Sequence, residues 1–275
     1  MLSNSLAHSA DRRTVGALAL IVLTPALFML SSYGGFFLAL LVNALACFVL
    51  HVINHNAFHV PLFTRASLNR CFSRSTSALL LVPASAISAS HIYNHHVHTN
   101  GARDWMNSGQ LGETHGVGRL VRYVWTTLRL PALRFREGSE RVPAELFREM
   151  RVESCIIAAT LLLSVLVSVK FALGIFASRG LALVLLFCVN LAQHDELDGE
   201  QGVNRSRNFL GPAMNYLLFN NGYHSGHHLF PSAHWSELPA LHACQVRDQL
   251  APTSQQPSLV GFFLRQYFLV RPSRS

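Results

Sequence analysis

Histidines are the residues in this sequence whose number and spacing point to chemistry. Fifteen are present, and eleven fall in four short segments: His51, His55 and His59; His91, His95, His96 and His98; His194; and His224, His227 and His228. Residues three or four apart on a helix share a face, so the larger clusters can each direct two or three imidazoles at one centre. This pattern is typical of metal ligation.

The number of histidines favours a site with two metal ions. A single tetrahedral zinc uses at most four protein ligands, whereas the segments together offer about nine. That supply is enough for two ions that each keep a position open for water or oxygen. Imidazole binds iron, zinc, copper and nickel, so the ligand type alone does not name the metal.

Three of the segments resemble the histidine boxes of the membrane fatty-acid desaturase and hydroxylase family. The first is His55-Asn56-Ala57-Phe58-His59, and the second is His91-Ile92-Tyr93-Asn94-His95-His96. The third is Asn221-Gly222-Tyr223-His224-Ser225-Gly226-His227-His228-Leu229-Phe230-Pro231. The pair Asn190-x-x-x-His194 also matches, and the resemblance covers roughly Val49 to His242.

This resemblance implies a fold, a cofactor and an activity. The fold would be an all-α integral membrane protein, with four transmembrane helices in two hairpins and a cytosolic helical cap that carries a di-iron site. The activity would be the O2-dependent oxidation of a lipid-like chain, with no catalytic residues beyond the metal ligands. The implied ligands are His55, His59, His91, His95, His96, His194, His224, His227 and His228, and Asn190 would hold a metal-bound water.

Three departures from the family pattern leave alternatives open. Asn56 stands where the family commonly has an acidic residue, which removes a partner for an imidazole N–H. His51 lies one helical turn before His55, so these two could form the first pair. His98 lies on the same ideal helical face as His91 and His95, so it competes with His96.

Apolar runs predict the elements that position the histidines. No charged residue occurs between Arg13 and Arg65, and a membrane helix needs about 20 apolar residues, so two spans fit there. We predict one membrane-embedded domain over residues 1–275, with spans at about 15–31, 36–53, 153–170 and 176–193 and a cap at about 54–152 and 194–275. The first run is too long for a signal-peptide core, so we expect it to be retained. Residues 75–87 and 120–135 are predicted to form interfacial or packed helices.

Positive charge predicts the orientation of these spans. Lys170 and Arg179 are expected in an outer connection, whereas eight arginines lie between Arg119 and Arg151. By the positive-inside rule, both termini and the middle segment face the cytoplasm, which places a multi-pass protein with its active site on the cytoplasmic side. The arginine-rich segment is expected to face anionic headgroups, or to dock an acidic electron donor or acyl carrier.

Cysteine usage bears on the source of electrons. The five cysteines form no C-x-x-C pair and match no iron–sulfur or haem-attachment pattern. Electrons would therefore come from a separate protein of ferredoxin, rubredoxin or cytochrome b5 type. The other expected partners are a lipid-like acyl substrate and membrane lipids, with no nucleic acid.

The predicted function is desaturation of a fatty acyl or similar lipid chain by two iron ions and O2. The same site could instead serve a hydroxylase or ketolase, or oxidise a carotenoid-like substrate. A histidine-rich metal-binding membrane protein and a bis-histidine haem protein are the rivals from other classes. We interpret the acidic group after His194 as a solvated turn, with a carboxylate ligand or base as the alternative; it comprises Asp195, Glu196, Asp198 and Glu200. We interpret the isolated histidines as structural: His8, His115, His234 and His242.

Overall fold

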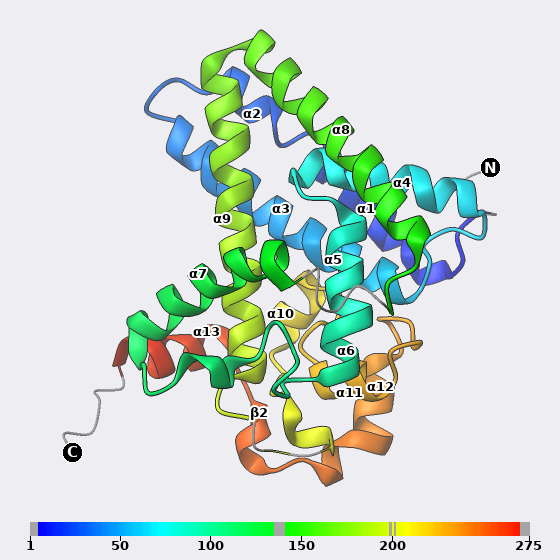
Figure 1. The fold of residues 1–275 in the computed structure, drawn as a ribbon, viewed down its shortest axis with the longest axis vertical. Coiled ribbons are helices and arrows are strands. Elements are labelled where there is room, and N and C mark those ends of the chain that lie inside the picture. The colour runs from blue at the N-terminus through cyan, green and yellow to red at the C-terminus, as the bar shows by residue number, and fades with distance from the viewer. Residues whose placement is uncertain (1–4, 135–140, 198–199, 201, 270–275) are drawn as a thin grey trace. The chain divides into compact units, whose positions relative to one another are not determined.

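A computed structural model describes residues 5–134, 141–197, 200 and 202–269. It is built almost entirely from helices (Figure 1). The chain forms two compact units, which are described separately. Unit 1 comprises Met1–Ala89 and Val142–Leu186, and unit 2 comprises Ser90–Arg141 and Phe187–Ser275.

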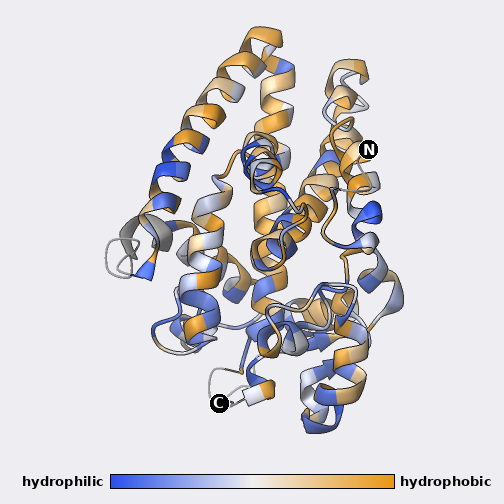
Figure 2. Ribbon diagram, turned by 90° about the vertical axis from the view of Figure 1, so that its right-hand side faces the viewer, coloured by the Kyte–Doolittle hydropathy of each residue, from blue (hydrophilic) through white to orange (hydrophobic). Residues whose placement is uncertain are grey.

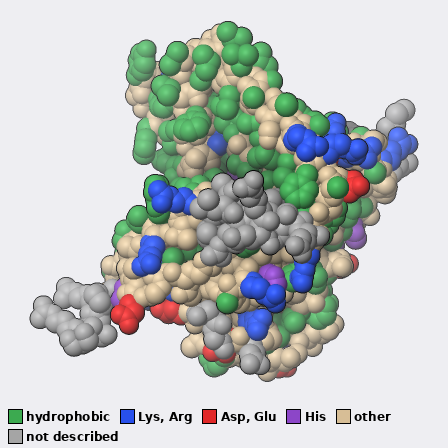
Figure 3. All heavy atoms as spheres, in the orientation of Figure 1, with side chains coloured by type: hydrophobic (Ala, Val, Ile, Leu, Met, Phe, Trp, Pro, Cys, Tyr) green, Lys and Arg blue, Asp and Glu red, His purple; other side chains and the backbone are tan. Residues whose placement is uncertain are grey.

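Unit 1 contains the long apolar helices. Its elements are η2 (Ser9–Asp11), α1 (Arg12–Ile21), α2 (Ala26–Leu30), α3 (Phe36–His59), α4 (Ala66–Leu80), α5 (Ala84–Ser90), α8 (Ala144–Val167) and the first two thirds of α9 (Val169–His194). Within the described residues, four stretches are long and apolar enough to cross a membrane: Ser9–Leu30, Phe36–His59, Ala144–Val167 and Val169–His194. Hydrophobic residues dominate these helices (Figure 2), and hydrophobic side chains gather at the top of the view, where α8 meets α9 (Figure 3).

The number of apolar helices agrees with the sequence prediction, but the connection between the third and fourth differs from it. Only Ser168 separates α8 from α9, so Lys170 and Arg179 lie within α9 and not in an outer connection. The ammonium of Lys170 donates to the carbonyl oxygen of Ser31, which lies in the loop between α2 and α3. The two hairpin connections of unit 1 are therefore adjacent.

Arg179 is buried inside unit 1, which the sequence did not predict. Its Nε donates to the carbonyl oxygen of Leu79 at 2.8 Å, in the last turn of α4, where the unpaired carbonyls carry partial negative charge. Its Nη1 donates to the side-chain oxygens of Asn43 and Ser178. These acceptors allow an arginine to lie in the middle of an apolar helix.

Close packing and polar contacts join three of the apolar stretches of unit 1. Phe28 is fully buried, and its ring lies only 2.5 Å from where a Cβ on Gly174 would be, so α9 requires glycine there. Asn43 of α3 donates to Thr24 Oγ1 at 2.6 Å and accepts from Ser178 Oγ at 2.8 Å. Each contact satisfies a polar group that would be costly to bury alone.

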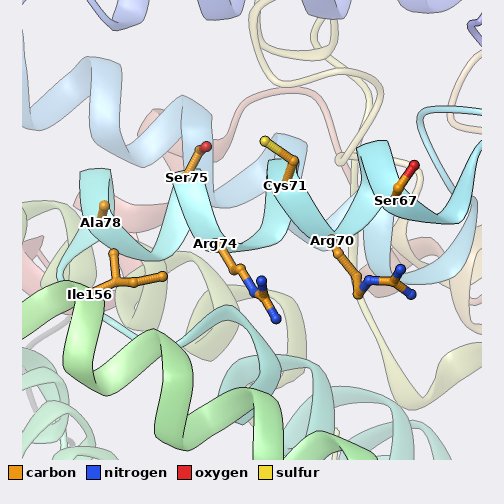
Figure 4. Close-up of a pocket in the computed structure, with 7 residues that line it drawn as sticks. All are labelled: Ser67, Arg70, Cys71, Arg74, Ser75, Ala78 and Ile156. Carbon is orange, nitrogen blue, oxygen red and sulfur yellow. The ribbon is translucent and has the colours of Figure 1, made fainter.

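Helices α4 and α8 are joined by charged contacts. Arg74 binds Glu149 through two nitrogens, at 2.8–3.1 Å, and the fully buried Glu153 accepts from Ser73 and Ser85. The predicted helix at 75–87 is interrupted, because Leu81 adopts a left-handed conformation and Pro83 follows it. A cavity of about 490 Å³ lies beside α4 and α8, and no histidine lines it. Its lining residues are Ser67, Arg70, Cys71, Arg74, Ser75, Ala78 and Ile156 (Figure 4).

Unit 2 is formed by short elements around the end of α9. They are η3 (His91–His95), α6 (His96–His98), η4 (Ser108–Leu111), α7 (Gly116–Arg134), η6 (Gly202–Arg205), β1 (Asn208–Phe209), α10 (Pro212–Leu217), α11 (His224–Leu229), α12 (Leu238–Leu241), η7 (His242–Val246), η8 (Arg247–Gln249), η9 (Pro252–Ser254), β2 (Gln255–Gln256), α13 (Leu259–Leu264) and η10 (Arg265–Leu269). The two strands pair in parallel, with Asn208 opposite Gln255. Gly222 precedes α11 at a point where any side chain would collide with the carbonyl oxygen of Phe209.

Candidate metal centre

Four histidines of unit 2 converge on one point. One potential ligand nitrogen from each of His95, His194, His224 and His228 lies within 4.8 Å of the others. The Nε2 of His224 is 2.9 Å from that of His194 and 3.2 Å from that of His228. Nitrogens about 2.1 Å from a shared ion lie about 3.0–3.4 Å apart at angles of about 90–109°. The observed separations are close to this range, and we call these four residues set A.

Three different elements supply set A. His95 ends the π-helical turn η3, His194 is the last residue of α9, and His224 and His228 lie one turn apart on α11. The i, i+4 spacing of the last two was evident from the sequence. Their approach to His95 and His194 depends on the tertiary fold of unit 2.

The ring of His95 indicates that an ion belongs in set A. Its Nδ1 lies 2.8 Å from Oδ2 of Asp104. Because a carboxylate only accepts hydrogen bonds, Nδ1 carries a proton, and in the neutral imidazole the lone pair is then on Nε2. That Nε2 is fully buried and has no hydrogen-bond partner among the described residues. A buried lone pair without a partner is costly, and a metal ion would satisfy it.

Asp104 is itself held in place by the backbone. It is fully buried and accepts hydrogen bonds from the amides of Asn100 at 2.7 Å and Met106 at 2.8 Å. Burial by itself would raise the pKa of Asp104, but the adjacent His95 and these amides outweigh it, so the pKa falls below its ordinary value. The carboxylate therefore stays ionised and fixes the orientation of the imidazole.

His194 is fixed in the same way through backbone oxygens. Its Nδ1 lies 3.0 Å from the carbonyl oxygen of Arg205, so Nδ1 carries the proton and Nε2 faces set A. The carbonyl oxygen of His194 accepts from the side chains of Asn100 and Ser108.

Burial, followed by the neighbouring imidazoles, lowers the pKa of His228 well below its ordinary value, so this ring is neutral and can act as a ligand.

A second group of histidines in unit 2 comprises His91, His96 and His227, which we call set B. The Nε2 of His96 lies 3.0 Å from the Nε2 atoms of both His91 and His227. His91 and His227 are buried. The two sets use seven of the nine predicted histidine ligands.

The π-helical turn corrects the expectation that His98 competes with His96. The amide of His96 donates to the carbonyl oxygen of His91, an i to i+5 bond that winds the turn more loosely than an α-helix. His91 and His96 therefore share a face, while His98 is half-buried at the end of α6 and belongs to neither set. The ideal helical spacing assumed from the sequence does not apply here.

The first-box histidines lie in unit 1, at the end of α3. The rings of His55 and His59 are 5.5 Å apart. His51 lies one turn earlier and is buried, and its Nε2 has no hydrogen-bond partner among the described residues. The assignment of His55 and His59 as ligands stays a prediction.

A comparison with known proteins agrees with this arrangement of histidines. The family model described as fatty acid desaturase matches residues 13–256. The chain belongs to the fatty acid desaturase family. Searches of curated proteins and of solved structures gave no significant match.

Asn190 lies one turn before His194 in this desaturase-family chain. Its side-chain oxygen is 2.5 Å from the hydroxyl of Tyr123, which is also 3.1 Å from the carbonyl oxygen of Met106. Burial raises the pKa of Tyr123 well above its ordinary value, so the phenol stays neutral. The role of Asn190 in holding a water stays a prediction, and Tyr123 is a contact that the sequence pattern did not indicate.

The acidic turn after His194 is only partly the solvated turn expected from the sequence, because its first carboxylate is buried. Asp195 is fully buried, and it accepts hydrogen bonds from Arg119 Nε at 2.7 Å and from the Tyr267 hydroxyl at 2.9 Å. It is not a member of either histidine set. Glu196 and Glu200 are exposed, and Asp198 lies outside the described residues.

The isolated histidines take no part in the two sets. His115 is exposed, and His234 bonds Ser236 Oγ at 2.8 Å. His242 is buried against the ring of Tyr223, with ring centroids 5.2 Å apart. None of these three histidines belongs to set A or set B.

Proposed function

We propose that this member of the desaturase family is an O2-dependent di-iron oxidoreductase that desaturates a fatty acyl or similar lipid chain. The observation that carries the proposal is set A, with its buried and unsatisfied Nε2 of His95. Set B supplies a second group of imidazoles in the same unit. Two groups of imidazoles fit two first-row ions better than one tetrahedral zinc.

In this proposal the iron ions are held by both sets together with His55 and His59, whose part rests on the sequence pattern. The bound irons would supply the oxidation of an unactivated C–H bond by O2. Removal of two hydrogens from adjacent methylenes, with O2, two electrons and two protons, gives one alkene and two waters. The electrons come from a separate protein of ferredoxin, rubredoxin or cytochrome b5 type.

The chain's own residues hold the ligands and their protons. Asp104 retains the proton on Nδ1 of His95, and the carbonyl oxygen of Arg205 retains the proton on Nδ1 of His194. Both Nε2 atoms are thereby presented as lone pairs. This fixed orientation is the contribution of the protein, since the oxidising chemistry belongs to the cofactor.

The proposal also places the protein in the membrane, with its metal centre on the cytoplasmic side. Four apolar helices support the membrane location, and the orientation follows from the distribution of arginine in the sequence. Cysteine labelling of a His115→Cys variant, made with the native cysteines replaced, tests the orientation because His115 is exposed in unit 2. Labelling from the extracellular side of intact cells would contradict it.

Metal and product analysis test the proposed activity. The full chain is expressed in a host that supplies reductant and candidate lipids, then purified for iron determination, while cell lipids are examined by mass spectrometry. We expect about two irons per chain, no haem absorption band, and a product two mass units lighter than its substrate. A product sixteen units heavier would assign hydroxylation to the site, and zinc or haem in place of iron would overturn the proposal.

A matched pair of variants separates ligation from general damage. We expect His228→Ala to lose iron and product, because the residue belongs to set A. His115→Ala serves as the control, since that histidine is exposed and belongs to neither set. Equal loss in both variants would contradict the assignment of ligands.

A further inference from the structure

Two amphipathic helices of unit 2 lie against each other. They are α7, over Gly116–Arg134, and the C-terminal helix formed by α13 and η10, over Leu259–Leu269, and Figure 1 shows α7 and α13 side by side. A Cβ on Gly116 would lie 3.2 Å from the carbonyl oxygen of Tyr267, so the backbones approach closely. The buried Tyr267 anchors the C-terminal helix.

Each of these helices exposes a stripe of large apolar side chains. On α7 the spacing is four, four and three residues, so the stripe follows one helical face. On the C-terminal helix the spacing is four, four and one, and the last two residues lie in its π-helical turn. All eight side chains are between 47% and 71% exposed: Val117, Val121, Trp125, Leu128, Val260, Leu264, Phe268 and Leu269. We call these eight residues the apolar face. Rows of exposed apolar side chains of this kind mark a contact with a protein or a membrane.

The charged residues within these two helices are all positive. Four arginines and no acidic residue occur in Gly116–Arg134, and Leu259–Leu269 contains Arg265 and no acidic residue. Arg122, Arg129 and Arg265 are exposed, and the guanidinium of Arg129 lies 3.9 Å above the ring of Trp125. A tryptophan beside arginines is the composition found at the boundary between lipid and water.

Neither helix is suited to cross a bilayer. The C-terminal helix is shorter than the about 20 residues that a span needs, and α7 carries too many arginines. An amphipathic helix with arginine on its polar side lies in the plane of the interface, and arginine near the surface favours anionic lipids. Because the same chain has four helices able to span a membrane, a bilayer is the partner that this surface meets.

We propose that the apolar face inserts into the headgroup region of an anionic phospholipid leaflet. The two helices act together there because both bind the same carboxylate. Arg119 of α7 and Tyr267 of the C-terminal helix each donate to Asp195, the residue that follows His194. Lipid contact therefore holds the end of α9 in place, and under the proposed function this steadies the metal ligand His194.

Tryptophan fluorescence tests the insertion directly and needs no enzyme activity. Trp125 is 57% exposed, whereas Trp105 and Trp235 are 6% and 8% exposed. The full chain is placed as single copies in nanodiscs whose lipids carry bromine at a shallow or a deep position of the acyl chain. Subtracting the signal of a Trp125→Phe variant leaves the contribution of Trp125.

We expect strong quenching of Trp125 by shallow bromine, weaker quenching by deep bromine, and little quenching by acrylamide in the water. Strong quenching by acrylamide with none by brominated lipid would overturn the proposal. Protection of Trp125 that appears only when two copies share a disc would also overturn it, because a second copy would then cover the face.

Charge variants test the preference for anionic lipid. In the wild type we expect shallow-bromine quenching to rise at least twofold when phosphatidylglycerol replaces about a third of the phosphatidylcholine. Arg122→Gln combined with Arg265→Gln should remove most of that rise while leaving Arg129 over Trp125. The control is Arg247→Gln, an exposed arginine of the same unit that pairs with Asp248. An unchanged rise in the double variant would refute the anionic preference.

Discussion

Asp104 Oδ2 lies 2.8 Å from Nδ1 of His95, and the two side chains are 0% and 1% exposed. This contact joins the second histidine box to a residue nine positions further along the chain. Because the carboxylate only accepts hydrogen bonds, it determines which nitrogen of His95 is available to a metal. The contact would therefore orient His95 for metal binding without touching an ion.

Asp104→Asn should weaken iron binding without unfolding the protein. An amide has nearly the same size, but it binds Nδ1–H less strongly and leaves the orientation of His95 less fixed. Loss of such a partner typically lowers metal affinity about 10- to 100-fold. The measurement is iron retained against a graded series of chelator concentrations, with Glu113→Gln, at an exposed acid, as the control. Unchanged retention would show that Asp104 has only a structural role.

His96→Ala and His98→Ala should behave differently. His96 lies 3.0 Å from two other imidazoles, whereas His98 belongs to neither histidine set. We expect His96→Ala to lose iron and product, and His98→Ala to keep most of both. Iron content and product yield of the purified variants measure the difference. The reverse result would mean that this segment is a regular α-helix in the working protein.

Asp195→Asn should destabilise unit 2 strongly. The substitution leaves the buried Arg119 without its counter-ion, and breaking such a pair costs about 3–5 kcal/mol. Tyr267→Phe removes one hydrogen bond to the same carboxylate and should cost about 1–2 kcal/mol. Thermal unfolding in detergent compares the two variants with Arg247→Gln. A larger effect for Tyr267→Phe than for Asp195→Asn would contradict the role given to the charge pair.

Arg179→Met should lower the thermal stability of unit 1. The change removes the guanidinium that donates to the carbonyl oxygen of Leu79, whereas Asn43 Oδ1 keeps its hydrogen bond from Ser178 Oγ. Each buried group left unsatisfied costs about 1–3 kcal/mol. Arg70→Met, at an exposed position of α4, provides the comparison in the same melting experiment. Equal melting temperatures would show that water or lipid replaces the guanidinium.

Local spacing predicted how the third-box histidines are arranged along their helix. The i, i+3 and i+4 pattern of His224, His227 and His228 survives because α11 is a regular helix. The same reasoning fails over His91–His98, because a π-helical turn changes which residues share a face. The count of apolar helices followed from hydropathy, since a charge-free run needs no knowledge of tertiary structure.

Long-range partners explain what the sequence could not indicate. Arg179 was expected at a helix end. Its acceptor is the carbonyl oxygen of Leu79 in the last turn of α4, and no local pattern indicates that this turn lies beside it. Asp195 was expected in solvent, but its partners lie 76 residues before it and 72 after it. Hydrogen bonds of this kind follow from packing and leave no periodic signal.

The π-helical turn also makes the two groups of imidazoles mechanically inseparable. Six consecutive residues send His95 to set A, and His91 and His96 to set B. Deleting one residue from the turn would convert it to an α-helical turn and rotate His95 relative to His91 and His96. Such a deletion would therefore disturb both sets and could not change only one of them. The distance between set A and set B therefore depends on the geometry of this one π-helical turn.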